Sequence, residues 1–181
     1  MARGSTVLHF TIELSDVDRG VYETLTLTPA QHPSETGAYL VARVLAHALE
    51  QTDGLTFTRG LSEAEEPALW VKDLTGRLRT WIEIGTPDAS RLHKASKAAD
   101  SVVVYAHRDP TPWLRSLAKE RVHASETIRL MALPVRELEA LAEEVGRRNA
   151  WSVSRVEGTV FIEADGVSHS LVVEELAWPE E

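Results

Sequence analysis

The sequence contains no cysteine and no long apolar run. Without cysteine the chain has no disulfide and no thiolate that could act as a metal ligand or a nucleophile. It also has no run of about 18 apolar residues and no arginine-rich start before an apolar stretch, which are the marks of membrane insertion and of targeting. We therefore expect a cytoplasmic protein that makes no contact with a membrane.

Several common catalytic motifs are missing as well. The sequence has neither a glycine-rich phosphate loop nor a GxSxG motif, and no two of its seven histidines stand at a short metal-ligand spacing. These absences argue against common nucleotide-binding enzymes, serine hydrolases and structural zinc sites. Carboxylates remain as candidates, and they suit the hard ions Mg²⁺ and Mn²⁺.

Length and charge point to one acidic domain with a basic stretch. A chain of 181 residues with 43% hydrophobic residues can build one good core, so we expect a single domain over residues 1–181. The net charge of −9 argues against non-specific wrapping along a polyanion. However, residues 91–123 contain seven Lys or Arg against three Asp or Glu, a local +4. This segment either contacts nucleic acid or forms a solvated helix face.

The first third of the chain predicts a β-hairpin followed by a helix. Residues 7–14 and 21–28 alternate between apolar and polar side chains around a turn at residues 16–20. His32-Pro33-Ser34-Glu35 signals the start of a helix, and Asp53-Gly54 ends it. Glu35 falls in the first turn, on the apolar stripe of that helix. Its carboxylate either stabilises the positive helix end or joins an acidic site.

The rest of the chain predicts strands and helices and then a closing meander. Residues 55–59 read as a short strand, and the apolar run 101–107 suits a central strand covered on both faces. Residues 113–121 and 135–148 have the pattern of helices, with a strand at 128–133 between them. Beyond Trp151 two turns separate three strand-like runs, and residues 178–181 should fray. The expected fold class is mixed α/β (α+β), with an N-terminal β-hairpin and a C-terminal antiparallel meander.

The candidate chemistry lies in a hairpin between residues 66 and 83. Two strand-like runs, 69–71 and 78–82, flank the turn residues 73–76. If they pair symmetrically about residues 74 and 75, Glu66 lies opposite Glu83. Two opposed carboxylates would attract a divalent metal, and at least one of the acid pKa values should rise. A slip of the register would separate the acids and make Asp73 or Glu65 the alternative to Glu66.

A helix with basic side chains should follow the hairpin. Thr86 suits the N-cap and Pro87 the first helical position. Arg91 and Lys94 lie on one flank of the apolar arc and lean toward the hairpin, while Lys97 points farther out. Gly85 leaves room beside Glu83 for a cation from elsewhere. We expect the Lys94 amine to approach Glu83 or Glu66; otherwise it is a solvated side chain, and Arg91 is the other cation to consider.

Four ordered motifs resemble those of one family. They are HPSET (32–36), FTRGLSEAEEP (57–67), WIEIGTPD (81–88) and RLHKA (91–95). Together with the chain length, they resemble the YaeQ family of small bacterial proteins over essentially the whole chain. The resemblance implies a restriction-endonuclease-like core of helix, three-strand meander, helix and strand, similar to the PD-(D/E)xK nuclease superfamily.

The resemblance also implies an acidic metal site. In that superfamily one acid on the first helix and one on each of two core strands bind Mg²⁺ and activate water, which corresponds here to Glu35, Glu66 and Glu83. The superfamily's strand lysine is replaced by Gly85. Some members of the superfamily take this lysine from the following helix, where Lys94 stands here.

Two functions are consistent with these features. The first is a Mg²⁺- or Mn²⁺-dependent, phosphodiester-cleaving, nuclease-like protein, with Glu35, Glu66 and Glu83 as metal ligands and Lys94 orienting the water. Arg91 and Lys97 are then the candidates for binding the substrate phosphate. The second is a non-catalytic module on a decayed nuclease fold that contacts protein or nucleic acid. The acids favour the first function, and the missing strand lysine and the acidic charge favour the second.

Overall fold

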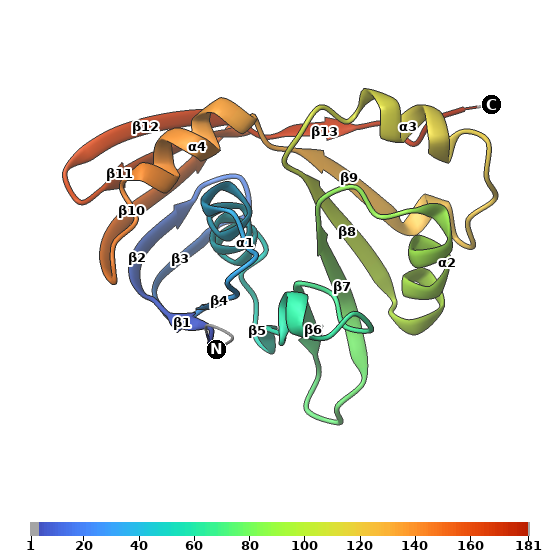
Figure 1. The fold of residues 1–181 in the computed structure, drawn as a ribbon, viewed down its shortest axis with the longest axis horizontal. Helices are drawn as coiled ribbons and strands as arrows, with labels where there is room; N and C mark the ends of the chain where they lie inside the picture. The colour runs from blue at the N-terminus through green and yellow to red at the C-terminus, as the bar shows by residue number, and fades with distance from the viewer. Residues whose placement is uncertain (1–3, 181) are drawn as a thin grey trace. The chain divides into compact units, whose positions relative to one another are not determined.

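The computed structural model describes residues 4–180, which belong to two compact units (Figure 1). Unit 1 comprises the chain up to Gln51 together with Pro134–Val173. Unit 2 comprises Thr52–Leu133 and the C-terminal segment from Glu174. Each unit has its own main sheet. The single domain expected over residues 1–181 stays a prediction.

Unit 1 is built on a five-stranded sheet with the order β12-β11-β10-β2-β3. Strands β2 (His9–Asp16) and β3 (Val21–Leu27) form the N-terminal hairpin. Strands β10 (Arg148–Val156), β11 (Thr159–Ala164) and β12 (Val167–Val172) form the antiparallel meander, which joins the hairpin through parallel pairing of β10 with β2. A separate two-stranded sheet contains β1 (Thr6–Val7) and β4 (Ala30–Gln31). The predicted hairpin and meander are both confirmed.

Helices α1 (Gly37–Leu49) and α4 (Val135–Glu143) pack against each other in unit 1. Strand β2 alternates between exposed and buried residues, so Phe10, Ile12 and Leu14 enter the core as their spacing predicts. A Cβ atom at Gly37 would lie 2.9 Å from the Cβ of Ala142. Glycine at this position therefore allows α1 to begin close to α4.

Unit 2 contains a six-stranded sheet with the order β13-β9-β8-β7-β6-β5. Strands β5 (Leu55–Phe57), β6 (Leu69–Lys72) and β7 (Leu78–Ile84) form an antiparallel meander. Helix α2 (Ala89–Ala98) then leads to β8 (Ser101–Ala106), which lies parallel to both β7 and β9 (Ile128–Ala132). The remaining elements are η1 (Gly60–Ser62), α3 (Thr111–Leu117), η2 (Ser125–Thr127) and β13 (Glu174–Leu176).

The order of these elements agrees with the expected core. Helix α1, the meander β5-β6-β7, helix α2 and strand β8 follow one another along the chain. Strand β8 is central in its sheet, as its continuous apolar sequence predicts. The mixed α/β fold class is confirmed.

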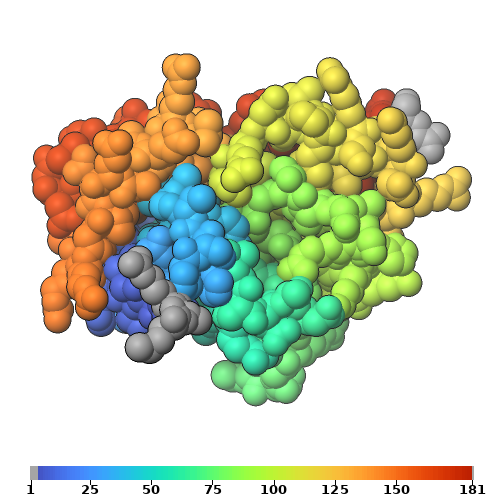
Figure 2. Space-filling view, viewed as in Figure 1, coloured from blue at the N-terminus to red at the C-terminus, as the bar shows by residue number. Residues whose placement is uncertain are grey.

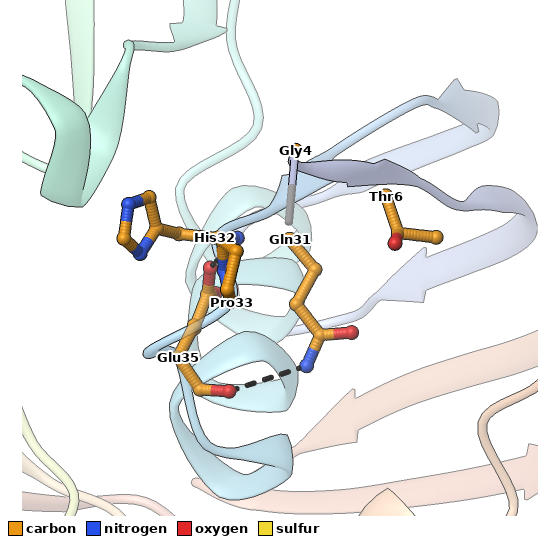
Figure 3. A pocket seen from close by; sticks show the side chains of 6 residues that line it. All are labelled: Gly4, Thr6, Gln31, His32, Pro33 and Glu35. Carbon is orange, nitrogen blue, oxygen red and sulfur yellow. Dashed lines mark hydrogen bonds between the residues drawn. The ribbon is translucent and has the colours of Figure 1, made fainter. Parts of the chain in front are cut away.

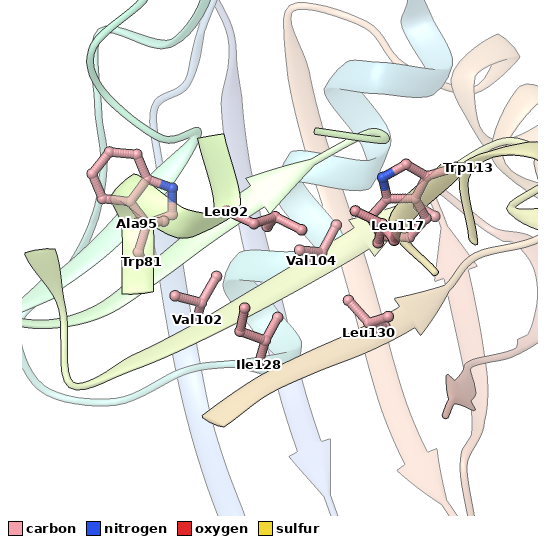
Figure 4. Packing of buried hydrophobic residues seen from close by; sticks show 10 residues of the cluster. Trp81, Leu92, Ala95, Val102, Val104, Trp113, Leu117, Ile128 and Leu130 are labelled. Atoms are coloured by element: carbon pink, nitrogen blue, oxygen red, sulfur yellow. The ribbon is translucent and has the colours of Figure 1, made fainter. Parts of the chain in front are cut away.

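Helices α2 and α3 cover the same face of the unit 2 sheet (Figure 4). Leu92 of α2 and Trp113 and Leu117 of α3 belong to one buried cluster with strand residues Trp81, Val102, Val104, Ala106, Ile128 and Leu130. The indole N–H of Trp113 donates to the carbonyl of Pro87 at 2.6 Å. Trp178 packs against this cluster, so the prediction of fraying is wrong for Trp178, while residue 181 lies outside the described residues.

Helix α1 begins later than the sequence predicted. Its N-cap is Thr36, whose hydroxyl accepts a hydrogen bond from the N–H of Tyr39 at 3.1 Å. Glu35 therefore precedes the helix, and its expected place in the first turn is wrong.

Two further helix boundaries differ from the predictions. Helix α2 is capped by Asp88 instead of Thr86, because the Asp88 carboxylate accepts from the N–H of Arg91 at 2.8 Å. Helix α4 ends at Glu143, and Arg148 already pairs with His9 in the sheet. This parallel partner is remote in sequence, so the helical pattern of residues 135–148 gave no sign of it.

Candidate functional site

The register of the β6-β7 hairpin separates the two acids that the sequence placed opposite each other. Trp70 pairs with Trp81, not with Arg79. The turn is centred on Thr75, with the Asp73 N–H donating to the Arg77 carbonyl, which shifts the ladder by one residue, and a bulge between Val71 and Lys72 shifts it by one more. Strand β6 begins at Leu69, so Glu66 lies outside it. The predicted cross-strand pair of Glu66 and Glu83 is therefore wrong.

Asp73 shapes the turn of this hairpin. Its carboxylate accepts from the N–H of Thr75 at 2.9 Å, from the Thr75 hydroxyl at 2.6 Å and from the N–H of Arg77 at 3.0 Å. The bonds from Thr75 contribute most to lowering the pKa of Asp73 below its ordinary value. Asp73 is thus a turn former, as its position suggested.

Glu83 is a buried carboxylate with two close donors. One of its oxygens, Oε1, accepts from the indole N–H of Trp81 at 2.7 Å and from Nε of Arg91 at 2.7 Å. Burial raises the pKa of the Glu83 carboxyl, and the charge of Arg91 opposes that rise. The expected rise of one acid pKa is confirmed, but its cause is removal from water and not a neighbouring carboxylate.

Arg91 is the cation that reaches Glu83. Besides Nε, its Nη1 donates to the carbonyl of Ala64 at 2.6 Å and its Nη2 to the carbonyl of Glu66 at 2.8 Å. All three nitrogens of the guanidinium thus have acceptors within the chain. Binding a phosphate through Arg91, as the sequence suggested, would require some of these contacts to open.

Glu66 and Lys94 each have another partner. The Glu66 carboxylate accepts from the backbone N–H of Arg59 at 3.1 Å and from its guanidinium at 2.7 Å. The side-chain hydrogen bond from Arg59 lowers the pKa of Glu66. Lys94 forms an ion pair with Glu65. Within the described part of the chain, Lys94 forms no ion pair with Glu83 or Glu66. The expected approach of the Lys94 amine to those two acids is therefore not seen.

His107 lies beside the space that Gly85 leaves. A Cβ atom at Gly85 would be 3.8 Å from Cε1 of His107, and the φ angle of Gly85 is +114°. Burial lowers the pKa of His107, with a smaller effect from Arg108. His107 is not among the predicted site residues, although a polar residue at the end of the apolar run 101–107 could have indicated it.

Glu35 belongs to unit 1, where it forms a buried ion pair. Its Oε1 accepts from Nε of Arg43 at 2.7 Å, and its Oε2 accepts from Nη2 of Arg43 at 2.9 Å and from the N–H of His32 at 3.1 Å. The two charged side chains are only 2–3% exposed. Among residues 4–180, no three His, Asp or Glu side chains are grouped so that they could hold a metal ion. A site of Glu35, Glu66 and Glu83 remains a prediction.

Sequence comparison identifies the family. A model of the family described as "YaeQ protein" matches residues 1–173. The chain belongs to the YaeQ family. "Uncharacterized protein YaeQ" from Escherichia coli (strain K12) and from Salmonella typhi are each 36% identical to it over 107 residues. The matched stretch covers 59% of this chain and 59% of each of those relatives.

Two crystal structures of YaeQ proteins share the fold. The protein from Pseudomonas syringae superposes with a TM-score of 0.89 at 37% identity, over 96% of both chains. The protein from Xanthomonas axonopodis pv. citri gives a TM-score of 0.88 at 37% identity, over 97% of this chain and 99% of the other. The resemblance to the YaeQ family that the motifs suggested is confirmed.

The HPSET motif, which carries part of the YaeQ resemblance, borders a polar pocket of about 250 Å³ in unit 1 (Figure 3). The pocket is lined by Gly4, Thr6, Gln31, His32, Pro33 and Glu35. The Gln31 amide donates to the backbone carbonyl of Glu35 at 3.4 Å, and Nδ1 of His32 lies 2.7 Å from the Ser34 hydroxyl. The Glu35 carboxylate beside this pocket is already held by Arg43 and by the His32 N–H.

The basic segment contributes an exposed surface, here named the α2–α3 face: Lys97, Arg115, Lys119 and Arg121. None of these four side chains forms an ion pair within residues 4–180. The N–H of His123 donates to Nδ1 of His93 at 3.2 Å, which joins the segment after α3 to α2. Lys97 is one helical turn from His93, so its charge adjoins this contact.

His47 makes the stability of unit 1 depend on pH. Burial in α1 lowers its pKa from 6.5 to about 4, so the folded protein keeps His47 neutral where the unfolded chain is protonated. Titration of His47 leaves the free energy of unfolding unchanged above about pH 6.5. As the pH falls from there toward about 4, the unfolded chain binds a proton that the folded protein does not, and the free energy of unfolding decreases by roughly 3 kcal/mol. Urea unfolding between pH 7 and 4 should show this slope, and His47→Gln should flatten it. Equal slopes in both proteins would contradict the assignment.

No helix within residues 4–180 is long and apolar enough to cross a membrane.

Proposed function

We propose that this YaeQ-family protein is a non-catalytic binding module that contacts the phosphate backbone of a nucleic acid through the α2–α3 face. One contrast supports this proposal. Each acid of the predicted metal site is already paired with a cation of the chain, whereas the four cations of the α2–α3 face have no ion pair within the described residues. The charges available to a partner are thus positive.

The surroundings of the face favour an anionic partner. Asp100, just after the C-cap of α2, forms ion pairs with Arg77 at 2.5 Å and with Arg79 at 3.1 Å. Two exposed acids lie near the four cations: Glu120, between Lys119 and Arg121, and Asp109, whose pKa is lowered mainly by hydrogen bonds from Thr111 and to a smaller extent by the charge of Arg115. In Figure 2 the surfaces of α2, in green, and of residues 111–127, in yellow, adjoin. Exposed Lys and Arg neutralise phosphates and release counterions, so such a face binds without reading sequence.

The net charge of −9 limits how the protein could bind. The acidic remainder of the surface repels a polyanion, so contact should be confined to one face and should be sensitive to salt. Weak and local binding of this kind suits a module that recognises nucleic acid through one contact patch.

The test is a titration of fluorescently labelled duplex DNA of about 20 base pairs, followed by anisotropy at low salt. We expect binding in EDTA that Mg²⁺ or Mn²⁺ does not enhance, because these ions compete with Lys and Arg for the phosphates, and an intact duplex on a denaturing gel afterwards. No binding at low salt would refute contact with nucleic acid. Metal-dependent cleavage that is lost in Glu83→Gln would refute the non-catalytic assignment.

A second candidate is metal-dependent phosphodiester cleavage, and one observation favours it. Glu83 is a buried carboxylate with a raised pKa, at the strand position where the nuclease superfamily has an acid. The residues as arranged do not fit a metal site, because Arg91 holds Glu83, Arg59 holds Glu66 and Arg43 holds Glu35. Mg²⁺ would have to displace these cations, and Lys94 would have to leave Glu65.

A further inference from the structure

The loop between β5 and β6 is closed at its base by its own residues. The N–H of Thr58 donates to the carbonyl of Ala68 at 3.2 Å, and the Thr58 hydroxyl donates to the carbonyl of Pro67. One step farther out, the Arg59 guanidinium binds the Glu66 carboxylate at 2.7 Å. Residues 58–67, here named the 58–67 loop, therefore form a loop closed at its base (Figure 1).

Helix α2 holds this loop through two cations. Arg91 donates to the carbonyls of Ala64 and Glu66, and Lys94 pairs with the Glu65 carboxylate. No residue of η1, at the tip of the loop, is buried, and Leu61 is 48% exposed there. The tip adds no buried apolar side chain, so polar contacts with α2 hold the outer part of the loop in place.

The same contacts place the loop over Glu83. A single guanidinium, that of Arg91, joins the Glu83 carboxylate to the two loop carbonyls. Glu83 is only 6% exposed, whereas Ala64 and Glu65 above it are exposed. The loop is thus tied through Arg91 to the buried Glu83 carboxylate.

We propose that the 58–67 loop is a lid over Glu83, which α2 holds shut through Arg91 and Lys94 and which phosphate groups bound on α2 release. The acceptors on the loop are two carbonyls and a carboxylate, the same kind of oxygen acceptor that a phosphate presents to Arg and Lys. Release by phosphate rests on the proposed nucleic-acid function. The closed position of the lid depends only on the contacts of Arg91 and Lys94 with the loop, not on the binding of nucleic acid.

Of the two α2 side chains that hold the 58–67 loop, Lys94 makes the weaker contact. Its side chain is 54% exposed and that of Glu65 is 72% exposed, so water and salt screen the pair. Lys94 is also one turn from Lys97 of the α2–α3 face, so a polyanion on that face comes within its reach. Arg91 makes three bonds and is only 32% exposed, so it should hold the loop more firmly.

Amide hydrogen exchange of the 58–67 loop tests the proposal. In the free protein, Lys94→Met should raise exchange of this segment about three-fold to five-fold. Arg91→Lys, which keeps the charge but cannot reach three acceptors at once, should raise it by at least about ten-fold. Lys97→Met is the matched control on the same helix, and it should leave exchange of the loop in the free protein unchanged.

Addition of duplex DNA separates the two proposals. In the wild type, DNA at saturation should speed exchange of the loop, and in Lys94→Met it should add little. DNA that binds without any change in loop exchange would overturn release by phosphate and leave the binding function standing. Unchanged loop exchange in both Lys94→Met and Arg91→Lys would overturn the lid itself, whether or not DNA binds.

Discussion

Replacing Glu35 with alanine should lower the free energy of unfolding by about 3–5 kcal/mol. The substitution leaves the Arg43 guanidinium, 3% exposed in the native protein, without the carboxylate that accepts its Nε and Nη2. The carbonyl of Ala30 stays as an acceptor at 3.0 Å, but it carries no full charge. The N–H of His32 also loses its acceptor. Urea unfolding followed by circular dichroism measures the loss.

Two variants show whether burial is the cause. Glu63→Ala removes a half-buried partner of the exposed Arg59 side chain, at 3.7 Å, and should cost less than about 1 kcal/mol. The double variant Glu35→Leu with Arg43→Met replaces both charges by apolar side chains, so it should recover much of the stability lost in Glu35→Ala. A loss of less than about 1 kcal/mol in Glu35→Ala would contradict a structural role for this pair.

Reversing three charges of the α2–α3 face should abolish most of the binding to duplex DNA. The combined change Lys97→Glu, Arg115→Glu and Lys119→Glu replaces attraction to phosphates by repulsion, so affinity at low salt should fall by about 100-fold or more. All three side chains are exposed, so the fold should be retained. Anisotropy titration gives the affinity, and circular dichroism checks the fold.

A control of equal charge distinguishes this face from the net charge of the protein. Arg136→Glu, Arg147→Glu and Arg148→Glu make the same change at exposed positions of unit 1. If the α2–α3 face binds DNA, this control should lose less than about three-fold in affinity, because screening limits the effect of charges that do not contact the DNA. Equal losses in the two triple variants would mean that net charge, not the face, governs binding.

Much of the fold could be predicted from local sequence patterns. The alternation of Phe10, Ile12 and Leu14 identified the face of β2 that enters the core, and the continuous apolar run at residues 101–107 identified a central strand. Both patterns reflect burial, because the polarity of each residue indicates whether its side chain faces the core. The start of β10 at Arg148 could not be predicted in this way, because its partner His9 is far away in sequence.

The candidate site was harder to predict, because it depends on register and on partners. A turn centred on Thr75 and a bulge between Val71 and Lys72 each shift the register by one residue, and β6 begins only at Leu69, so Glu66 does not pair with Glu83. The sequence indicated Arg91 as a cation near the hairpin. Its hydrogen bond to Glu83 depends on side-chain packing, which the spacing of residues in the sequence does not encode. Arg59 gave no signal, since its pairing with Glu66 arises from the closed 58–67 loop.

The salt dependence of binding to duplex DNA tests the central claim most directly. The wild-type protein should bind in EDTA with an affinity that falls linearly in a plot of log K against log salt concentration. Four phosphate contacts, one for each cation of the α2–α3 face, predict a slope of about −3 to −4. A flat plot, or no binding at the lowest salt, would contradict binding of DNA phosphates by the α2–α3 face.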